Sequence, residues 1–253
     1  MKISILQINP VWEDKTANFI NISRMMRDLY ASTDLIILPE MFSTGFSMNT
    51  SLAEEYNGTT FKWMREQAEH GKFAVCGSFI VREDNKYHNR FVFVSPEEVW
   101  FYNKRHLFSM GNEDKFFTPG NSRLIFNYKG FRICPFICYD LRFPVWSRNR
   151  SEYDLAIYSS SWPAARANVW STLLKARAIE NQCYVAGANR TGTDGNNILH
   201  NGKSQIIDAK GEIILSAGEK EEVFSAELSL AELNLFRKKF NTLKDSDDFI
   251  LNT

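Results

Sequence analysis

Three side chains that could act together in acyl transfer each follow or end an apolar run. Residues 131–137 are mostly apolar, and the run stops at Cys138, where a polar segment containing a proline begins. This change is typical of a buried strand that leads into a helix N-terminus. Free backbone N–H groups and the positive end of the helix dipole should lower the pKa of a thiol there, and the thiolate is its nucleophilic form. Glu40 ends the run 34–40, and Lys104 follows the run 99–103.

A thiol, a carboxylate and an amine together suit attack on a carbonyl group. The thiolate attacks the carbon, the carboxylate moves protons, and the ammonium group stabilises the oxygen that becomes negative. Because ligands bind at the carboxyl ends of strands in layered α/β folds, we expect Glu40, Lys104 and Cys138 to meet at one site. Taken singly, each has a structural alternative: Cys138 as a buried core cysteine, Glu40 as a turn residue or helix cap, and Lys104 as part of a solvated basic turn.

The elements that must position these side chains include both helices and strands. Apolar spacings of three and four predict helices at residues 14–29, 59–70, 163–181 and 230–240. Three predicted hairpins turn at Asp84–Asn85, Lys129–Gly130 and Lys210–Gly211. Strands are predicted at residues 1–8, 34–40, 73–81, 88–94, 99–103, 124–128, 131–138, 154–159, 183–188 and 223–228, and the third hairpin spans residues 204–215. No linker or internal repeat divides the chain, so we predict a single domain over residues 1–253, with mixed sheets covered by helices.

Composition narrows the classes of protein and partner. The chain has 253 residues, of which 44% are hydrophobic and 24% charged, as in an ordinary globular protein. A formal net charge of zero argues against nucleic acid or an anionic membrane as a partner. No apolar run approaches the roughly 20 residues of a membrane span, and the N-terminus reads as a strand without a signal peptide, which favours a cytoplasmic location. The four cysteines lie in apolar surroundings and read as reduced thiols, and the scattered histidines predict no metal site.

Three segments in order resemble the catalytic motifs of the nitrilase superfamily of carbon–nitrogen hydrolases. They are residues 38–42 (LPEMF), 102–107 (YNKRHL) and 138–144 (CYDLRFP), and further likeness lies at 160–163, 174–182 and 187–195. The resemblance extends from Lys2 to about Phe249. Within the superfamily, the segment 138–144, the Arg-Asn-Arg at 148–150 and the ending 240–245 are most similar to the ω-amidase branch. That branch hydrolyses the distal amide of 2-oxo acid amides such as 2-oxoglutaramate and 2-oxosuccinamate.

The resemblance implies a four-layer α-β-β-α sandwich that associates into a homodimer, and it implies no metal and no organic cofactor. It identifies Cys138 as the nucleophile, Glu40 as the general base and acid, and Lys104 as the cation that stabilises the oxyanion, helped by the backbone N–H of Tyr139. Glu113 matches an additional glutamate of many members, which would steer the substrate or the water. The family often carries a histidine after that glutamate, whereas this chain has Asp114.

The small-molecule amide is harder to define than the chemistry. A 2-oxo dicarboxylic monoamide carries a carboxylate that needs a cation when it is buried, and Arg142 is the candidate, with a structural salt bridge as its alternative. Phe42, Phe116, Tyr139 and Trp162 are candidate pocket walls, although aromatic residues in a chain with 20 phenylalanines are more often core. Two other readings stay open: a superfamily hydrolase acting on another amide, an N-carbamoyl amino acid or a nitrile, and a non-catalytic scaffold or binding protein.

Overall fold

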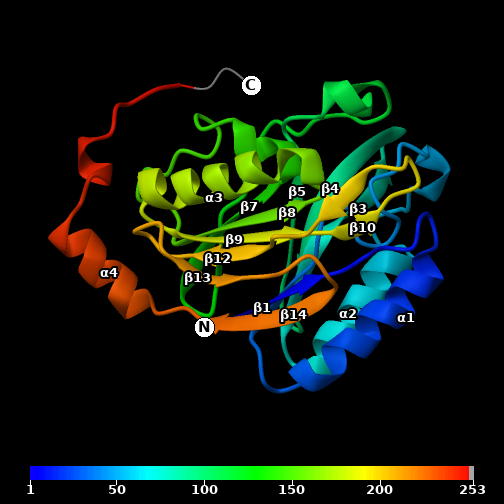
Figure 1. The fold of residues 1–253 in the computed structure, drawn as a ribbon, viewed down its shortest axis with the longest axis horizontal. Coiled ribbons are helices and arrows are strands. Elements are labelled where there is room, and N and C mark those ends of the chain that lie inside the picture. Colours follow the sequence, from blue (N-terminus) through cyan, green and yellow to red (C-terminus); the bar gives the residue numbers. More distant parts are fainter. Residues whose placement is uncertain (251–253) are drawn as a thin grey trace.

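The computed structural model describes residues 1–250 as two six-stranded mixed sheets with helices outside them (Figure 1). In the first sheet, three parallel strands have antiparallel neighbours on both sides. Its order is β14 (Glu222–Glu227), β1 (Lys2–Gln7), β2 (Leu35–Ile37), β3 (Ala74–Glu83), β4 (Lys86–Val94) and β5 (Val99–Asn103). Residues 251–253, which the predicted domain includes, lie outside the described residues.

The second sheet repeats this mixed arrangement. Its order is β13 (Ile213–Ser216), β12 (Gln205–Ile207), β9 (Tyr184–Asn189), β8 (Leu155–Ser160), β7 (Phe131–Ile137) and β6 (Phe126–Tyr128). Strands β9, β8 and β7 are parallel, and β12 and β6 flank them antiparallel. The carboxyl ends of β7 and β8 therefore lie side by side, which matters because Cys138 and Ser161 follow them directly.

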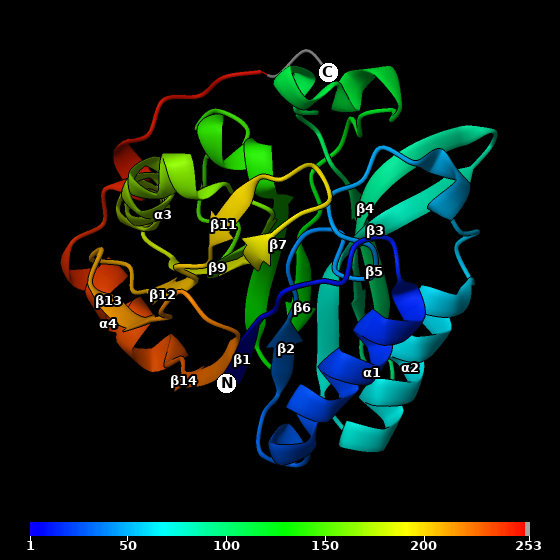
Figure 2. The ribbon, with the colours of Figure 1, turned by 45° about the vertical axis from the view of Figure 1, so that its right-hand side comes forward.

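Helices form the two outer layers (Figure 2). Helices α1 (Lys15–Met26) and α2 (Thr59–Gly71) cover the first sheet, and α3 (Ala167–Asn181) covers the second. Helix α4 (Leu230–Lys239) lies beside β13. The predicted α-β-β-α sandwich is thus confirmed. None of the helices among residues 1–250 is long and apolar enough to cross a membrane.

The alternation of side chains along each strand builds two apolar layers. On β2, Leu35 and Ile37 belong to the core between the sheets, whereas Ile36 packs in the cluster beneath α1 and α2. Across the middle of the sandwich, the rings of Phe93 on β4 and Phe126 on β6 lie 4.7 Å apart between centroids. This packing fixes one sheet against the other, and with it the strand ends that each sheet contributes.

Most predicted elements are confirmed, and the differences are at their ends. The predicted helix 14–29 is α1 followed by a 3-10 turn, Arg27–Leu29, and the predicted helix 163–181 begins with a 3-10 turn, Ala164–Arg166. The hairpin of β10 (Thr191–Thr193) and β11 (Leu199–Asn201) was not predicted, because its strands are too short to show an apolar alternation. It links the two halves, since Thr191 N–H donates to the carbonyl of Ile8 at 2.8 Å.

Candidate active site

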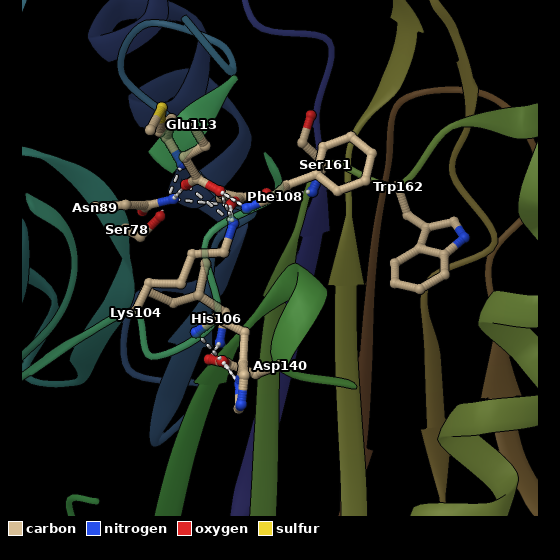
Figure 3. A network of polar contacts seen from close by, with 12 residues as sticks. Ser78, Asn89, Lys104, His106, Phe108, Glu113, Asp140, Ser161 and Trp162 are labelled. Atoms are coloured by element: carbon tan, nitrogen blue, oxygen red, sulfur yellow. Dashed lines mark hydrogen bonds and ion pairs between the residues drawn. The ribbon is translucent and has the colours of Figure 1, made fainter. Parts of the chain in front are cut away.

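The predicted change from strand to helix occurs at Cys138, and the helix is a short 3-10 helix, Cys138–Arg142. The backbone of Cys138 has a φ of +42°, in the left-handed region that side chains rarely adopt. The buried carboxylate of Asp140 holds this turn. Its Oδ2 accepts from Ile137 N–H at 3.0 Å and from the Tyr102 hydroxyl at 2.8 Å. Its Oδ1 accepts from His106 N–H at 2.9 Å and lies 2.8 Å from His106 Nδ1 (Figure 3).

Lys104 is buried between two carboxylates. It follows β5, and its N–H donates to the carbonyl of Asn89 on β4 at 2.9 Å. Its Nζ lies 2.7 Å from Glu40 Oε1, and 3.0 and 2.8 Å from Glu113 Oε1 and Oε2. Figure 3 shows the side chains of Asn89, Lys104 and Glu113 converging on this point. The solvated basic turn is therefore not the environment of Lys104.

Glu40 connects the cation to the thiol. It follows β2, and Asn89 Nδ2 donates to its Oε1 at 2.8 Å, while Ser161 N–H donates to its Oε2 at 3.0 Å. The charge of the same carboxylate acts on the neighbouring Cys138 thiol and raises its pKa. The structure thus brings Glu40, Lys104 and Cys138, which are far apart in sequence, into one contiguous cluster.

Burial sets the protonation states of this cluster. Burial, together with the charge of Glu40, raises the pKa of the Cys138 thiol well above its ordinary value, against the opposing effect of Lys104. The lowered pKa predicted from the helix N-terminus is therefore wrong for the free enzyme. Burial and the neighbouring Glu113 raise the pKa of Glu40, although Lys104 lowers it. Burial alone would lower the pKa of Lys104, but Glu113 and Glu40 raise it above its ordinary value.

Glu113 is the second carboxylate that holds Lys104. It is fully buried, and besides both contacts from Lys104 it accepts from Asn89 Nδ2 at 2.9 Å and from Phe108 N–H at 2.6 Å. Each carboxylate oxygen thus accepts two hydrogen bonds from the protein. Since both oxygens of Glu113 are occupied by these protein donors, its place fits the positioning of Lys104 better than contact with substrate.

A cavity of about 280 Å³ opens over Cys138 and Lys104. This volume lies near the lower end of small-molecule pockets, about 300–1,000 Å³, and suits a small substrate. The predicted wall residues Tyr139 and Trp162 line it, as does Arg142, the candidate for the substrate carboxylate. Other lining residues that the sequence analysis did not single out are Phe46, Phe108, Arg166 and Asp194.

Two predicted wall residues lie elsewhere. Phe42 is fully buried and packs against Trp63 of α2 and Phe79 of β3, because the chain turns at Met41, whose φ is +46°. Phe116 is 46% exposed and does not line the cavity. In both cases the position near a motif residue was the only signal, and an aromatic side chain close in sequence can point away from the site.

Several polar groups of the site left little trace in the sequence. Asn89 gave none, since a single asparagine within an apolar strand reads as a solvent-facing residue. His200 lines the cavity, with its Nε2 3.4 Å from Ser161 Oγ, and burial lowers its pKa to about 4, so it is neutral at pH 7. No group of three or more potential metal ligands gathers anywhere in residues 1–250.

Comparisons with known proteins agree with the geometry. Residues 2–238 match the carbon–nitrogen hydrolase family. The chain is 44% identical to the omega-amidase YafV of Escherichia coli K12 over 99% of this chain and 98% of that protein. It is 31% identical to a 2-oxoglutaramate amidase of Bacillus subtilis, with 96% of each covered.

Solved structures give the same answer. XC1258 from Xanthomonas campestris, a CN-hydrolase superfamily protein with an arsenic adduct in its active site, is 39% identical and superimposes with a TM-score of 0.98 over 100% of this chain and 99% of its own. Nit3 of Saccharomyces cerevisiae, a member of the nitrilase superfamily, is 25% identical with a TM-score of 0.85 over 95% and 94% of the two chains. The chain therefore belongs to the carbon–nitrogen hydrolase family, the nitrilase superfamily, and is an amidase-type enzyme.

Proposed function

We propose that this enzyme is a cysteine-dependent amidohydrolase that releases ammonia from the distal amide of 2-oxo dicarboxylic acid monoamides such as 2-oxoglutaramate and 2-oxosuccinamate. The observation that carries the proposal is the clustering of the Cys138 thiol, the Glu40 carboxylate and Lys104 at a cavity of substrate size. The similarity to an omega-amidase and a 2-oxoglutaramate amidase supports the substrate class.

The first half of the reaction forms a thioester. Glu40 takes the proton of the Cys138 thiol as the sulfur attacks the carboxamide carbon, and the carbonyl electrons move to the oxygen. Because burial and the charge of Glu40 raise the pKa of the Cys138 thiol well above its ordinary value, the sulfur keeps its proton in the free enzyme. When the carbon–oxygen double bond re-forms, the carbon–nitrogen bond breaks, and Glu40 gives its proton to the departing ammonia.

The second half consumes water. Glu40 takes a proton from a water molecule, which attacks the thioester carbon, and the carbon–sulfur bond then breaks. The Cys138 thiolate regains its proton from Glu40. The 2-oxo dicarboxylate product, whose second carboxylate comes from the amide carbon, is then released. The same carboxylate therefore serves as base and acid in both halves, as general acid–base catalysis requires.

The developing oxyanion has two donors in this proposal. Lys104 Nζ lines the cavity and is held by the buried carboxylates. Tyr139 follows the nucleophile in the first turn of the 3-10 helix, where backbone N–H groups lack partners within the helix. One such donor contributes about 3–4 kcal/mol in other acyl-transfer enzymes.

Arg142 supports a substrate that carries a carboxylate. It lines the cavity, and its guanidinium carbon lies 4.9 Å from the centroid of the Trp162 ring. Within residues 1–250, no carboxylate lies within ion-pair distance of Arg142, so the structural salt bridge considered as its alternative is not formed there. We assign Arg142 to the substrate carboxylate. The homodimer and the cytoplasmic location remain predictions from the sequence.

An ammonia-release panel tests the proposal. Wild-type enzyme and Cys138→Ala are compared on 2-oxoglutaramate, 2-oxosuccinamate, glutamine, an N-carbamoyl amino acid and a simple nitrile. We expect release from the two 2-oxo amides only, loss of turnover in the variant, and an unchanged circular dichroism spectrum. Mass spectrometry of acid-quenched wild-type enzyme should find the acyl group on the peptide that contains Cys138.

Two outcomes would contradict this assignment. Ammonia release by Cys138→Ala at near the wild-type rate would remove Cys138 as the nucleophile. A preference for the carbamoyl compound or the nitrile would keep the chemistry but replace the substrate class with the alternative from the sequence analysis.

A further inference from the structure

Two arginines face the active-site cavity without a protein partner. Arg142 and Arg166 both line it and are half-buried, and in the described part of the chain neither guanidinium donates a hydrogen bond or forms an ion pair. Elsewhere the fold pairs its partly buried arginines, as when Arg132 and Arg237 both contact Asp154, at 2.7 and 2.5 Å. An arginine that is half-buried and unpaired next to a cavity is available to a ligand.

Aromatic rings hold the two guanidinium groups in place. The guanidinium carbon of Arg142 lies 4.9 Å from the Trp162 ring centroid, and that of Arg166 lies 5.6 Å from the Phe108 ring centroid. Trp162 connects the two residues, since its Nε1 donates to the backbone carbonyl of Arg166 at 2.9 Å. A guanidinium stacked on a ring face keeps its N–H edge free for a planar acceptor.

The Trp162 ring that supports Arg142 is itself held in place. It is nearly fully buried, and its backbone N–H donates to Asn189 Oδ1 at 2.7 Å. In Figure 3 the Trp162 ring is set apart from the cluster of Lys104 and Glu113, and the guanidinium of Arg142 lies against that ring. That separation is what a substrate with its amide at one end and its carboxylate at the other requires.

The other charges of the cavity do not neutralise these arginines. Lys104 lies between two carboxylates, those of Glu40 and Glu113, so this cluster adds no positive charge to the cavity. The remaining carboxylate of the lining, Asp194, accepts the N–H groups of Asn196 and Ile198 through Oδ1, at 2.8 and 2.9 Å. Two guanidinium groups face this one carboxylate in the lining, so the wall around Trp162 keeps a net positive charge, which favours an anionic ligand over a neutral one.

We infer that Arg166 is a specificity-determining residue that binds the carboxylate end of the substrate together with Arg142. This inference rests on the proposed amidase function and adds a residue to it. A 2-oxo acid presents three oxygen acceptors, two on the carboxylate and one on the neighbouring carbonyl. One guanidinium fork satisfies the carboxylate in a bidentate pair, and the second supplies donors for the remaining lone pairs.

A pair of matched substrates isolates the role of Arg166. 4-Oxopentanamide has the chain length and the ketone of 2-oxoglutaramate but a methyl group in place of the carboxylate. We expect Arg166→Met to raise KM for 2-oxoglutaramate about tenfold or more, with a smaller change in kcat, as loss of one charge-assisted contact predicts. The ratio of kcat/KM for 2-oxoglutaramate to that for 4-oxopentanamide should fall by a similar factor.

Matched variants control for charge and for folding. Arg24→Met makes the same change on an exposed residue of α1 and should leave the ratio unchanged. Arg166→Lys should recover part of the ratio, because it restores the charge without the fork. Binding of the product 2-oxoglutarate to Cys138→Ala, measured by calorimetry, should weaken about tenfold when Arg166→Met is added, as loss of about 1.4 kcal/mol requires.

The outcomes separate this inference from the proposed function. An equal loss for both amides in Arg166→Met, or unchanged product binding, would remove Arg166 from the substrate site while leaving the amidase assignment intact. Wild-type enzyme that hydrolyses both amides equally well would overturn the carboxylate site altogether. Absence of ammonia release from every amide would instead contradict the proposed function, and product binding would still test Arg166.

Discussion

Lys104→Met should destabilise the fold because it leaves two buried carboxylates without their cation. Lys104 Nζ lies 2.7 Å from Glu40 Oε1 and 2.8 Å from Glu113 Oε2, with all three side chains buried. At an effective dielectric constant of about 20, each contact is worth about 6 kcal/mol of Coulomb energy, most of which offsets the cost of removing the charges from water. Removing one partner from such a cluster lowers the free energy of unfolding by about 3–5 kcal/mol.

The size of this loss should depend on pH in a known direction. Burial and Glu113 already raise the pKa of Glu40 in the wild type, and loss of the cation removes the main effect that lowers it. A carboxyl group whose pKa is raised on folding favours the folded protein when it is protonated. The free energy of unfolding then falls as the pH rises through the raised pKa. The loss in free energy of unfolding of Lys104→Met should therefore become smaller as the pH is lowered from 8 to 5. The change is up to about 1.4 kcal/mol per pH unit for one proton taken up.

Guanidinium chloride unfolding at several pH values measures this effect. Wild type and Lys104→Met are compared at equal ionic strength by circular dichroism, and Lys104→Met/Glu113→Gln serves as the matched control. The double variant keeps a single carboxylate, so it should recover part of the stability at pH 8. A deficit below about 1 kcal/mol at every pH, or one that grows as the pH falls, would refute the reasoning about buried charge.

Three further perturbations address the same site. Glu113→Gln removes a negative neighbour that raises the pKa of Glu40, so the acid limb of the kcat/KM profile should move to lower pH. In the wild type we expect that limb above pH 4.5, and an upward shift in the variant would contradict the role of Glu40 as the base. Asp140→Asn leaves backbone donors of the turn that carries Cys138 without an acceptor. The free energy of unfolding in a denaturant titration should fall by about 1.5–3 kcal/mol, and kcat should fall more than tenfold. Unchanged kinetics would mean that this turn does not affect catalysis. Iodoacetamide should alkylate Cys138 first, since the other three cysteines are fully buried. The rate of this alkylation should keep rising above a pH of about 8.5. A plateau of the rate below pH 7 would mean a stable thiolate in the free enzyme.

The strand ends that carry Glu40, Lys104 and Cys138 could be predicted because apolar runs stop there. Period-two and helical patterns respond to burial on one face, and the layers of this sandwich are built on those patterns. The same patterns placed the hairpin turn at Asp84–Asn85, where Glu83 pairs with Lys86. Local sequence was enough wherever the environment of a residue depends on its near neighbours.

Contacts between distant segments could not be predicted in this way. Asn89 lies 49 residues from Glu40 and 24 from Glu113, and it bonds both carboxylates. The raised pKa of Cys138 arises from burial and from the charge of Glu40, neither of which the neighbouring sequence contains. Phe42 was placed wrongly for the related reason that the direction of a side chain after a turn depends on the backbone at Met41.

The reacting groups come from both halves of the sandwich. Glu40 and Lys104 extend from β2 and β5 of one sheet, whereas Cys138 and Ser161 extend from β7 and β8 of the other. The chemistry therefore exists only while the two layers are docked in register. A partly denatured state that kept its strands but let the layers slide would retain its far-ultraviolet spectrum and lose turnover, so hydrolysis reports on tertiary packing rather than on secondary structure.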